Sequence, residues 1–257
     1  MKTSTPYSKQ RFVLGLILFF TTMTSSQISK NYGQRLDNTQ YATSAAEAAL
    51  SEMFVQGLGK TSETLELENI NGSPYLNESF TKGKVFYKDS LMGEHFLRYN
   101  AYSDEVELKR TVLKEESIKA LLKDKYIYCT ISGVPVVYTS YSNDKEQMLN
   151  GYLLKITEGS QYSLYVKKTK IFKEGKISTN SLAQSIPPKF VDETEYYIGK
   201  HHDNIKIHLP VKKRKLLQVF NIALRPKIKK YIKQHKIKLK DKNELVKLIA
   251  HVNTLHL

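Results

Sequence analysis

The sequence predicts an α+β protein, built mainly on an antiparallel β-sheet with one helix before it and a helical subdomain after it. The 257 residues are 40% hydrophobic and 25% charged, which is typical of a chain that folds around a core. Through the middle of the chain, short runs alternate apolar and polar residues and are separated by turn signals, a pattern that favours hairpins. The apolar residues of the last 47 residues have helical spacing. The sheet could also be curved, up to a half-barrel.

The N-terminus has the layout of an export signal. Lys2, Lys9 and Arg11 precede an uncharged apolar run, residues 12–20, and small polar residues follow. Nine apolar residues span only about 14 Å as a helix, less than half of a bilayer core of roughly 30 Å. We therefore expect residues 1–26 to be a signal peptide that is cleaved near Ser26 and Gln27, and the mature protein to be periplasmic or secreted. An uncleaved anchor is the alternative.

The body, residues 27–210, is predicted to be a β-rich domain with an early helix. Ser44 and Glu47 fit a capping box at the start of that helix, and an apolar stripe continues it with Ala46, Leu50, Met53 and Phe54. A second short helix is expected over 115–123, and the loop over 175–188 is the best internal boundary. The predicted strands are 64–68, 84–87, 95–99, 105–108, 126–131, 134–141, 151–157, 162–169, 196–198 and 205–209.

The final segment, residues 211–257, is predicted to be a basic amphipathic helical subdomain packed on the same domain. Pro226 suits the first turn of a helix, and Asp241 with Glu244 fits a capping box. Three apolar stripes have helical spacing: Leu216, Phe220, Ala223 and Leu224; Ile228, Tyr231, Ile232 and His235; Leu245, Leu248, Ile249 and Val252.

The net charge of +15 is concentrated at the ends of the chain. The signal peptide has three basic residues, and the body balances 23 basic against 23 acidic residues. The last 47 residues have 14 basic and 2 acidic residues, a net charge of +12. The mature protein is therefore neutral except for its helical end.

Four lysines of that end are the candidates for an anionic surface: Lys229, Lys230, Lys233 and Lys236. Clustered lysines near an anionic surface contribute about 1 kcal/mol each within a Debye length. Anionic lipid or glycan of the cell envelope is the expected partner, and the export signal argues against nucleic acid. The alternative is a solvated helix surface without a partner.

The sequence contains few candidates for catalytic or metal-binding residues. His201, His202 and His208 are the only cluster of metal-type ligands, but adjacent residues of a strand point to opposite faces. The neighbouring carboxylates Asp104 and Glu105 do not establish the geometry of a hydrolase. The chain contains no nucleophile elbow, HExxH helix, phosphate-binding loop or dinucleotide fingerprint, so we expect no cofactor and no enzyme. A hydrolase with scattered catalytic residues remains an alternative.

Cysteine and hydropathy exclude further classes of protein. The single cysteine, Cys129, excludes a disulfide framework and a cysteine-based zinc site, and its apolar surroundings indicate a buried residue. The mean hydropathy of −0.43 excludes a polytopic membrane protein.

Aromatic residues are biased toward tyrosine, with 17 Tyr, 10 Phe and no Trp. Many of the tyrosines lie in predicted strands, where a half-buried ring with a solvated hydroxyl fits a sheet face. A Tyr-lined groove for an apolar or carbohydrate ligand is the competing interpretation. The choice depends on whether the rings share one face.

Three strings of the body, GSPYLNE at 72–78, KGKV at 82–85 and LRYNAYSDEVE at 97–107, resemble a family of uncharacterised exported proteins of Gram-negative bacteria. The Lys-rich end with residues 241–253 resembles the end of that family. The resemblance implies export and a single domain, and it implies no activity. The architecture is also similar to that of periplasmic half-barrel lipoprotein carriers, whose curved sheet holds acyl chains. We therefore expect an exported, non-enzymatic protein that is envelope-associated or binds a ligand, with a lipid or lipoprotein carrier as an alternative.

Overall fold

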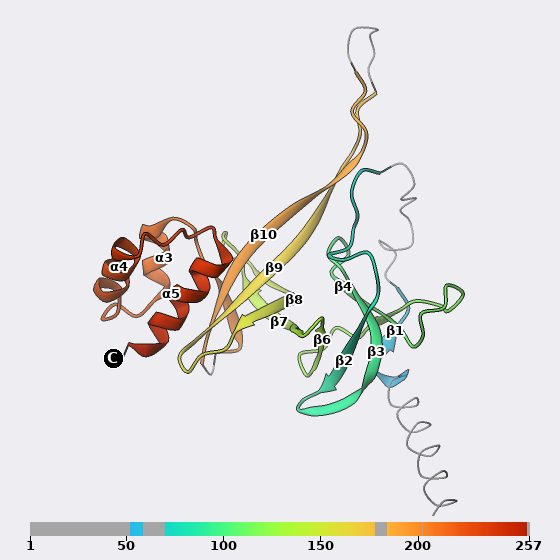
Figure 1. Cartoon of the computed structure of the whole chain (residues 1–257), viewed down its shortest axis with the longest axis horizontal. Helices are drawn as coiled ribbons and strands as arrows, with labels where there is room; N and C mark the ends of the chain where they lie inside the picture. Colours follow the sequence, from blue (N-terminus) through green and yellow to red (C-terminus); the bar gives the residue numbers. More distant parts are fainter. Residues whose placement is uncertain (1–51, 59–69, 178–183, 202, 256–257) are drawn as a thin grey trace, which may run out of the picture. The chain divides into compact units, whose positions relative to one another are not determined.

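The computed structural model describes residues 52–58, 70–177, 184–201 and 203–255. Across these residues eleven strands form one mostly antiparallel sheet, and three helices follow it (Figure 1), which confirms the α+β class. The predicted signal peptide, the capping box at Ser44 and the strand over 64–68 lie outside the described residues. All described residues belong to one unit, Ala46–Leu257.

The strands have the following bounds: β1 Val55–Gln56, β2 Thr81–Tyr87, β3 Ser90–Asn100, β4 Glu105–Lys109, β5 Lys119–Leu121, β6 Ile127–Ile131, β7 Val134–Ser142, β8 Met148–Thr157, β9 Tyr162–Lys173, β10 Lys189–Lys200 and β11 Ile205–His208. The helices are α3 Lys213–Val219, α4 Arg225–Gln234 and α5 Lys242–Thr254. In the sheet the order is β1-β5-β4-β3-β2-β6-β7-β11-β10-β9-β8.

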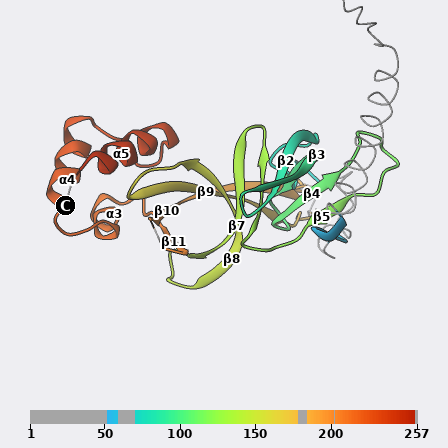
Figure 2. The ribbon, with the colours of Figure 1, turned by 90° about the horizontal axis from the view of Figure 1, so that it is seen from below.

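Strands β7 to β11 close on one another. Strands β7, β8, β9 and β10 pair in this order as an antiparallel meander. Strand β11 then closes the set, because it pairs antiparallel with β10 and parallel with β7. Each of the five strands therefore has a hydrogen-bonded neighbour on both sides. Figure 2 shows them following one another around a ring.

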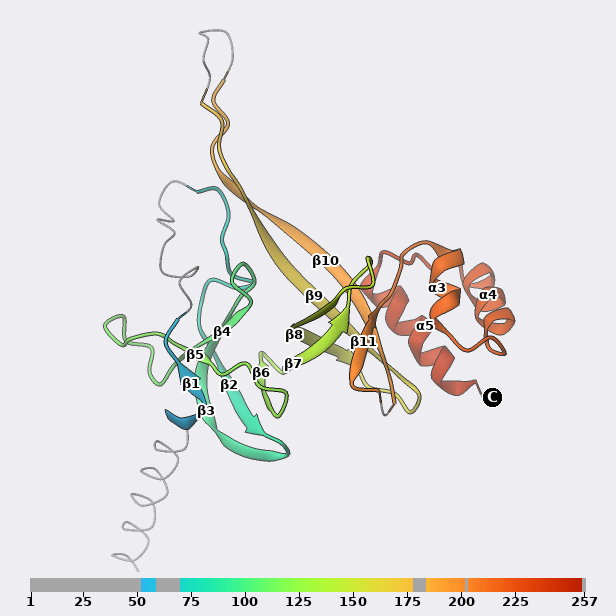
Figure 3. The same cartoon turned by 180° about the vertical axis from the view of Figure 1, so that it is seen from behind.

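The hairpin between β9 and β10 differs from the expected boundary. The two strands pair without interruption from Lys173 opposite Lys189 to Tyr162 opposite Lys200. Lys176 and Ile186 form a further bridge beyond these strands, so the described residues on both sides of the expected boundary belong to one hairpin and one unit. Strand β10 begins at Lys189, earlier than the predicted Tyr196. The first half of β10 shows no alternation of apolar and polar residues, because lysines, threonines and glutamates occupy both faces of the long β9–β10 ribbon in Figure 3. The sequence therefore did not predict it.

The predicted helix over 115–123 is wrong. Lys119–Leu121 form strand β5, in which Ala120 pairs with Glu107 of β4 and with Gln56 of β1. Ala120 and Leu121 are both buried, so neighbouring residues face opposite sides of the sheet. Partners distant in the sequence supply the backbone hydrogen bonds here, which local helix propensity does not register.

Helices α4 and α5 begin where the sequence predicts. Pro226 lies in the first turn of α4, and the Asp241 carboxylate accepts hydrogen bonds from the amides of Asn243 and Glu244 at the start of α5. Glu244 does not complete the capping box, because it pairs with Lys247 at 2.7 Å. Most residues of the predicted stripes are buried, with Leu216, Ile228, Leu248 and others in one core with Leu164 and Ile198 of the sheet, whereas Ala223 and His235 are exposed.

One side chain fixes the end of α5 to the sheet. The Asn253 Oδ1 accepts from the amides of Gln161 and Tyr162 at 3.0 and 2.8 Å, and its Nδ2 donates to the Tyr162 carbonyl at 2.9 Å. These three bonds satisfy the backbone of the β8–β9 connection. The helical end is therefore attached to the sheet by polar contacts as well as by apolar packing.

Candidate functional site

The four candidate lysines lie on one side of α4 and the turn after it. Lys229, Lys230 and Lys233 belong to α4 and Lys236 follows it, and all four side chains are exposed. The opposite side of the helix is buried through Ile228 and Ile232. We call these four residues the lysine surface.

The charge of the lysine surface is not neutralised by neighbours. No ion pair found within the described residues involves any of its four members, and α4 itself contains no acidic residue. Apolar packing of Ile228 and Ile232 therefore holds the helix in place while its outer side remains cationic. Such a surface attracts anions over about a Debye length, roughly 8 Å at physiological salt.

The rest of the helical end adds to this charge. Of its 14 basic residues, all but Lys213 and Arg225 are exposed. Arg225 is used within the fold, where its Nε donates to the Phe220 carbonyl at 3.0 Å and its Nη2 donates to the Gln218 carbonyl at 3.1 Å. The structure thus assigns one basic side chain to the end of α3 and leaves most of the others to solvent.

Three rings stack beside this surface, a feature that the sequence pattern did not reveal. The Tyr231 ring lies 3.8 Å from the His251 ring and 4.2 Å from the His235 ring, measured between centroids. Burial, and then the neighbouring His235, lower the pKa of His251, so its ring is neutral at pH 7. The sequence places Tyr231 and His235 on one helical stripe, but it does not reveal that the Tyr231 ring contacts His251 of α5.

The histidine candidates for metal ligation are not brought together. His208 pairs in register with Tyr197, four residues before His201, which is about 13 Å along the strand. Its Nε2 lies 3.8 Å from Glu195 Oε1, while the backbone amide of His201 donates to the Gln161 carbonyl. His202 lies outside the described residues. Within the described part of the chain, no group of three or more His, Cys, Asp or Glu side chains could hold a metal ion.

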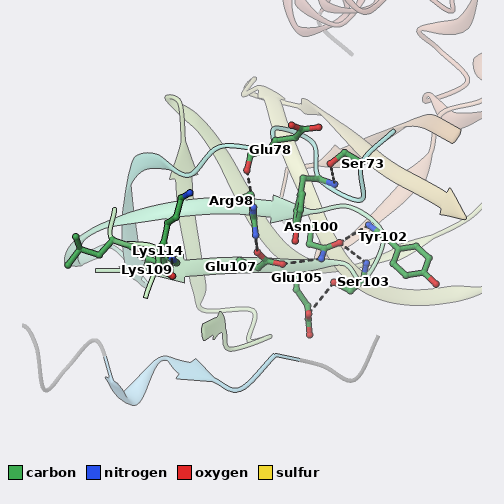
Figure 4. Close-up of polar contacts among 12 residues, drawn as sticks. Ser73, Glu78, Arg98, Asn100, Tyr102, Ser103, Glu105, Glu107, Lys109 and Lys114 are labelled. Atoms are coloured by element: carbon green, nitrogen blue, oxygen red, sulfur yellow. Dashed lines mark hydrogen bonds and ion pairs between the residues drawn. The ribbon is translucent and has the colours of Figure 1, made fainter. Parts of the chain in front are cut away.

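A buried polar cluster on β3 and β4 was missed by the sequence reasoning (Figure 4). Arg98 Nε donates to Glu107 Oε2 at 3.0 Å, and Asn100 Nδ2 donates to Glu107 Oε1 at 3.0 Å. The guanidinium is also stacked on the Tyr75 ring at 3.5 Å and donates to the Glu78 carbonyl. These contacts hold the segment before β2 against the sheet, so the cluster has a structural role.

The carboxylates considered for hydrolysis are engaged in the same way. Asp104 Oδ1 lies 2.7 Å from both the Lys167 Nζ and the Tyr99 hydroxyl. Glu105 is buried and accepts from the Ser103 hydroxyl at 3.1 Å. Asp104 therefore joins the β3–β4 turn to Lys167 of β9, and Glu105 is bonded to the Ser103 side chain of the same turn.

The tyrosines of the strands do not share one face. Tyr99 and Tyr152 contact each other within the large core, whereas Tyr141, Tyr165 and Tyr197 form a smaller cluster with Leu153. Tyr152 and Leu153 are consecutive residues of β8, so the two clusters occupy opposite faces of that strand. The rings thus fill two separate packing layers.

One apolar pocket of about 110 Å³ lies beside β3, β6 and β7. Its lining includes Leu76, Leu97, Ile131, Val134 and Val136. This volume is below the range of roughly 300–1,000 Å³ that is typical of sites for small-molecule ligands.

Comparison of the chain with protein-family models, curated proteins and solved structures found no match. Across the described residues, none of the helices has the length and apolar character needed to cross a membrane.

Proposed function

We propose that the protein is an exported, non-enzymatic protein that binds an anionic surface of the cell envelope through its helical end. The observation that carries the proposal is the lysine surface, four exposed lysines without ion-pair partners among the described residues, held on a helix whose other side is buried. Export rests on the layout of residues 1–26 and on the resemblance to exported proteins.

The magnitude of the effect supports this partner. At about 1 kcal/mol for each lysine close to an anionic surface, four lysines contribute about 4 kcal/mol, or a factor of roughly a thousand in binding. A folded helix presents these charges at fixed spacing, so less entropy is lost on binding than for a flexible arm. The neutral body of the protein adds little attraction, which limits contact to the helical end.

The two alternatives have weaker support. A carrier of acyl chains with a curved, half-barrel sheet would need an apolar cavity of several hundred Å³, and the apolar pocket beside β3 has about 110 Å³. Strands β7 to β11 also pair around a ring and do not leave an open concave edge between them. A hydrolase built on Asp104 and Glu105 would need these carboxylates to face a substrate, whereas both are hydrogen-bonded within the fold.

Vesicle sedimentation tests the proposal with the mature chain, residues 27–257. We expect binding to vesicles that contain phosphatidylglycerol, no binding to pure phosphatidylcholine, and a loss of binding as salt increases. Changing all four residues of the lysine surface to Gln should weaken binding at least tenfold. The matched control changes four exposed lysines of the body to Gln, namely Lys82, Lys123, Lys145 and Lys173.

Equal loss in the two variants would mean that net charge alone drives binding and would contradict the proposal. Binding to neither vesicle type would also contradict it. Circular dichroism of each variant checks that the helices remain folded.

A further inference from the structure

A groove of about 430 Å³ lies where the β9–β10 hairpin meets the segments that flank the helices. It is lined by Lys168, Thr194, Tyr196, Val211 and Lys240. Its volume falls within the range of roughly 300–1,000 Å³ that is typical of small-molecule sites. The lysine surface contributes none of the lining residues.

The sheet supplies one cation and two hydroxyls to the groove. Lys168 and Thr194 are directly opposite each other in the β9–β10 register, and the Lys168 Nζ donates to the Thr194 Oγ1 at 2.8 Å. Because the Thr194 oxygen accepts this bond, its own proton is free to donate to another acceptor. Tyr196 lies two residues further along β10, so its ring is on the same face as Thr194.

The helical end supplies a second cation. Lys240 is exposed and directly precedes Asp241, the residue that caps α5. The Asp241 carboxylate already accepts from the amides of Asn243 and Glu244, at 2.8 and 3.0 Å. Among the described residues that line the groove there is no carboxylate, and no ion pair in the described part of the chain involves Lys168 or Lys240.

The Tyr196 hydroxyl can also act as a donor. Burial, and then the charge of Asp241, raise the pKa of Tyr196, so the phenol keeps its proton at neutral and mildly alkaline pH. Two ammonium groups and two hydroxyl donors thus line one groove. This set matches a phosphate ester, which offers several acceptor oxygens and about two negative charges.

We propose that this groove binds the phosphate ester of an envelope component, such as a phosphorylated sugar or a phospholipid headgroup. The inference deepens the proposed function by naming the chemical group that is bound, and it rests on that function for the source of the ligand. The lysine surface attracts the anionic envelope over a distance, and the groove recognises one phosphate at contact range.

Isothermal titration calorimetry of the mature chain with glucose 1-phosphate, glycerol 3-phosphate and glucose tests the groove. We expect binding of at least one phosphate ester and none of uncharged glucose. A preference for glucose 1-phosphate would identify a glycan as the source, and a preference for glycerol 3-phosphate would identify a lipid headgroup. Amide shifts of Thr194 and Tyr196 in nuclear magnetic resonance spectra should change during the titration.

Substitutions separate the groove from the lysine surface. Lys168→Gln with Lys240→Gln should weaken phosphate-ester binding at least tenfold, and Tyr196→Phe should weaken it several-fold without a change of charge. The matched control, Lys229→Gln with Lys233→Gln, removes the same charge from the lysine surface and should leave this binding within twofold. Equal loss in the two double variants, or binding of glucose as strong as that of its phosphate, would overturn the proposal.

The test of the groove and the test of vesicle binding can fail separately. A protein that sediments with anionic vesicles but binds neither phosphate ester would retain the proposed function and lose the groove. A protein that binds a phosphate ester in the groove but ignores vesicles would lose the envelope surface and retain the groove.

Discussion

Arg98 of β3 and Glu107 of β4 lie directly opposite each other in the sheet, and the guanidinium donates to one carboxylate oxygen from both Nε and Nη2. Glu107 is only 1% exposed, and its other carboxylate oxygen accepts from Asn100 Nδ2 at 3.0 Å. The exposed pair Lys84–Glu94, between β2 and β3, has the same cross-strand arrangement in solvent. The two pairs therefore form a natural comparison of a buried and a solvated ion pair.

Arg98→Ala should destabilise the protein by about 3–5 kcal/mol, because it leaves a buried carboxylate without its cation. Lys84→Ala should cost less than about 1 kcal/mol, since its partner Glu94 is solvent-exposed and stays hydrated without the lysine. The measurement is the free energy of unfolding in urea for each variant. Similar costs for the two substitutions would show that burial does not decide the value of the Arg98 pair.

Asn253→Ala should release the end of α5 from the sheet. The substitution removes three hydrogen bonds to the backbone of Gln161 and Tyr162, at a cost of about 2 kcal/mol. Hydrogen exchange of the α5 amides should accelerate more than that of the β2–β3 amides. Asn243→Ala is the control, because its exposed side chain makes no hydrogen bond found within the described residues. Unchanged exchange of α5 in Asn253→Ala would contradict the role of this contact.

Tyr141 should make stability fall at alkaline pH. Burial, and then the charges of Asp104 and Glu195, raise its pKa to about 12, compared with about 10 in the unfolded chain. The folded protein keeps the phenol proton longer, so this stabilisation is complete below pH 10 and is lost as the pH rises to 12. The expected contribution is on the order of 1 kcal/mol.

Urea unfolding at pH 9 and pH 11 measures this contribution. The wild type should lose more stability between the two values than Tyr141→Phe does. Tyr126→Phe, at a ring that is 45% exposed, should behave like the wild type. If Tyr141→Phe has the same pH dependence as the wild type, Tyr141 does not titrate above its unfolded range.

Local signals account for the parts of the fold that the sequence predicted. Ser132 and Gly133 form the turn that joins β6 to β7, where both have positive φ angles, 50° and 79°, and glycine adopts such an angle without steric cost. Asp241 caps α5 because its carboxylate reaches amides only two and three residues away. Such turns and caps depend only on residues that are close in the chain, so the sequence alone is enough to predict them.

The parts that the sequence did not predict depend on distant residues. Strand β5 forms because β1 and β4 pair with it, and the parallel pairing of β7 with β11 joins residues more than sixty positions apart. Glu105 and Glu107 alternate with Val106 and Leu108, a pattern that is typical of a strand with one solvated face. The segment before β2 covers that face, and only the register of Arg98 with Glu107 would have revealed the buried pair.

The candidate site follows the same division. The lysine surface was predicted because the spacing of Lys229, Lys233 and the apolar stripe lies within one helix. The groove was not predicted, because its two lysines are far apart in the sequence: Lys168 belongs to β9 and Lys240 to the turn before α5. A charge count could not select these two lysines from the other basic residues of the chain.

Cys129 should be inert toward thiol reagents in the folded protein. Its side chain is fully buried in the core between β2 and β7, and burial raises its pKa, so very little reactive thiolate forms at pH 8. A chromogenic disulfide reagent should modify about one thiol per chain in urea and almost none in native buffer. Ser90→Cys adds an exposed thiol at the start of β3 and should react at once, as a control for the reagent.

Because modification of Cys129 requires opening of the sheet, its rate should increase in Arg98→Ala by the factor that corresponds to the lost stability. Fast modification of the native wild type would mean that the β2–β6–β7 layer opens far more readily than its burial predicts.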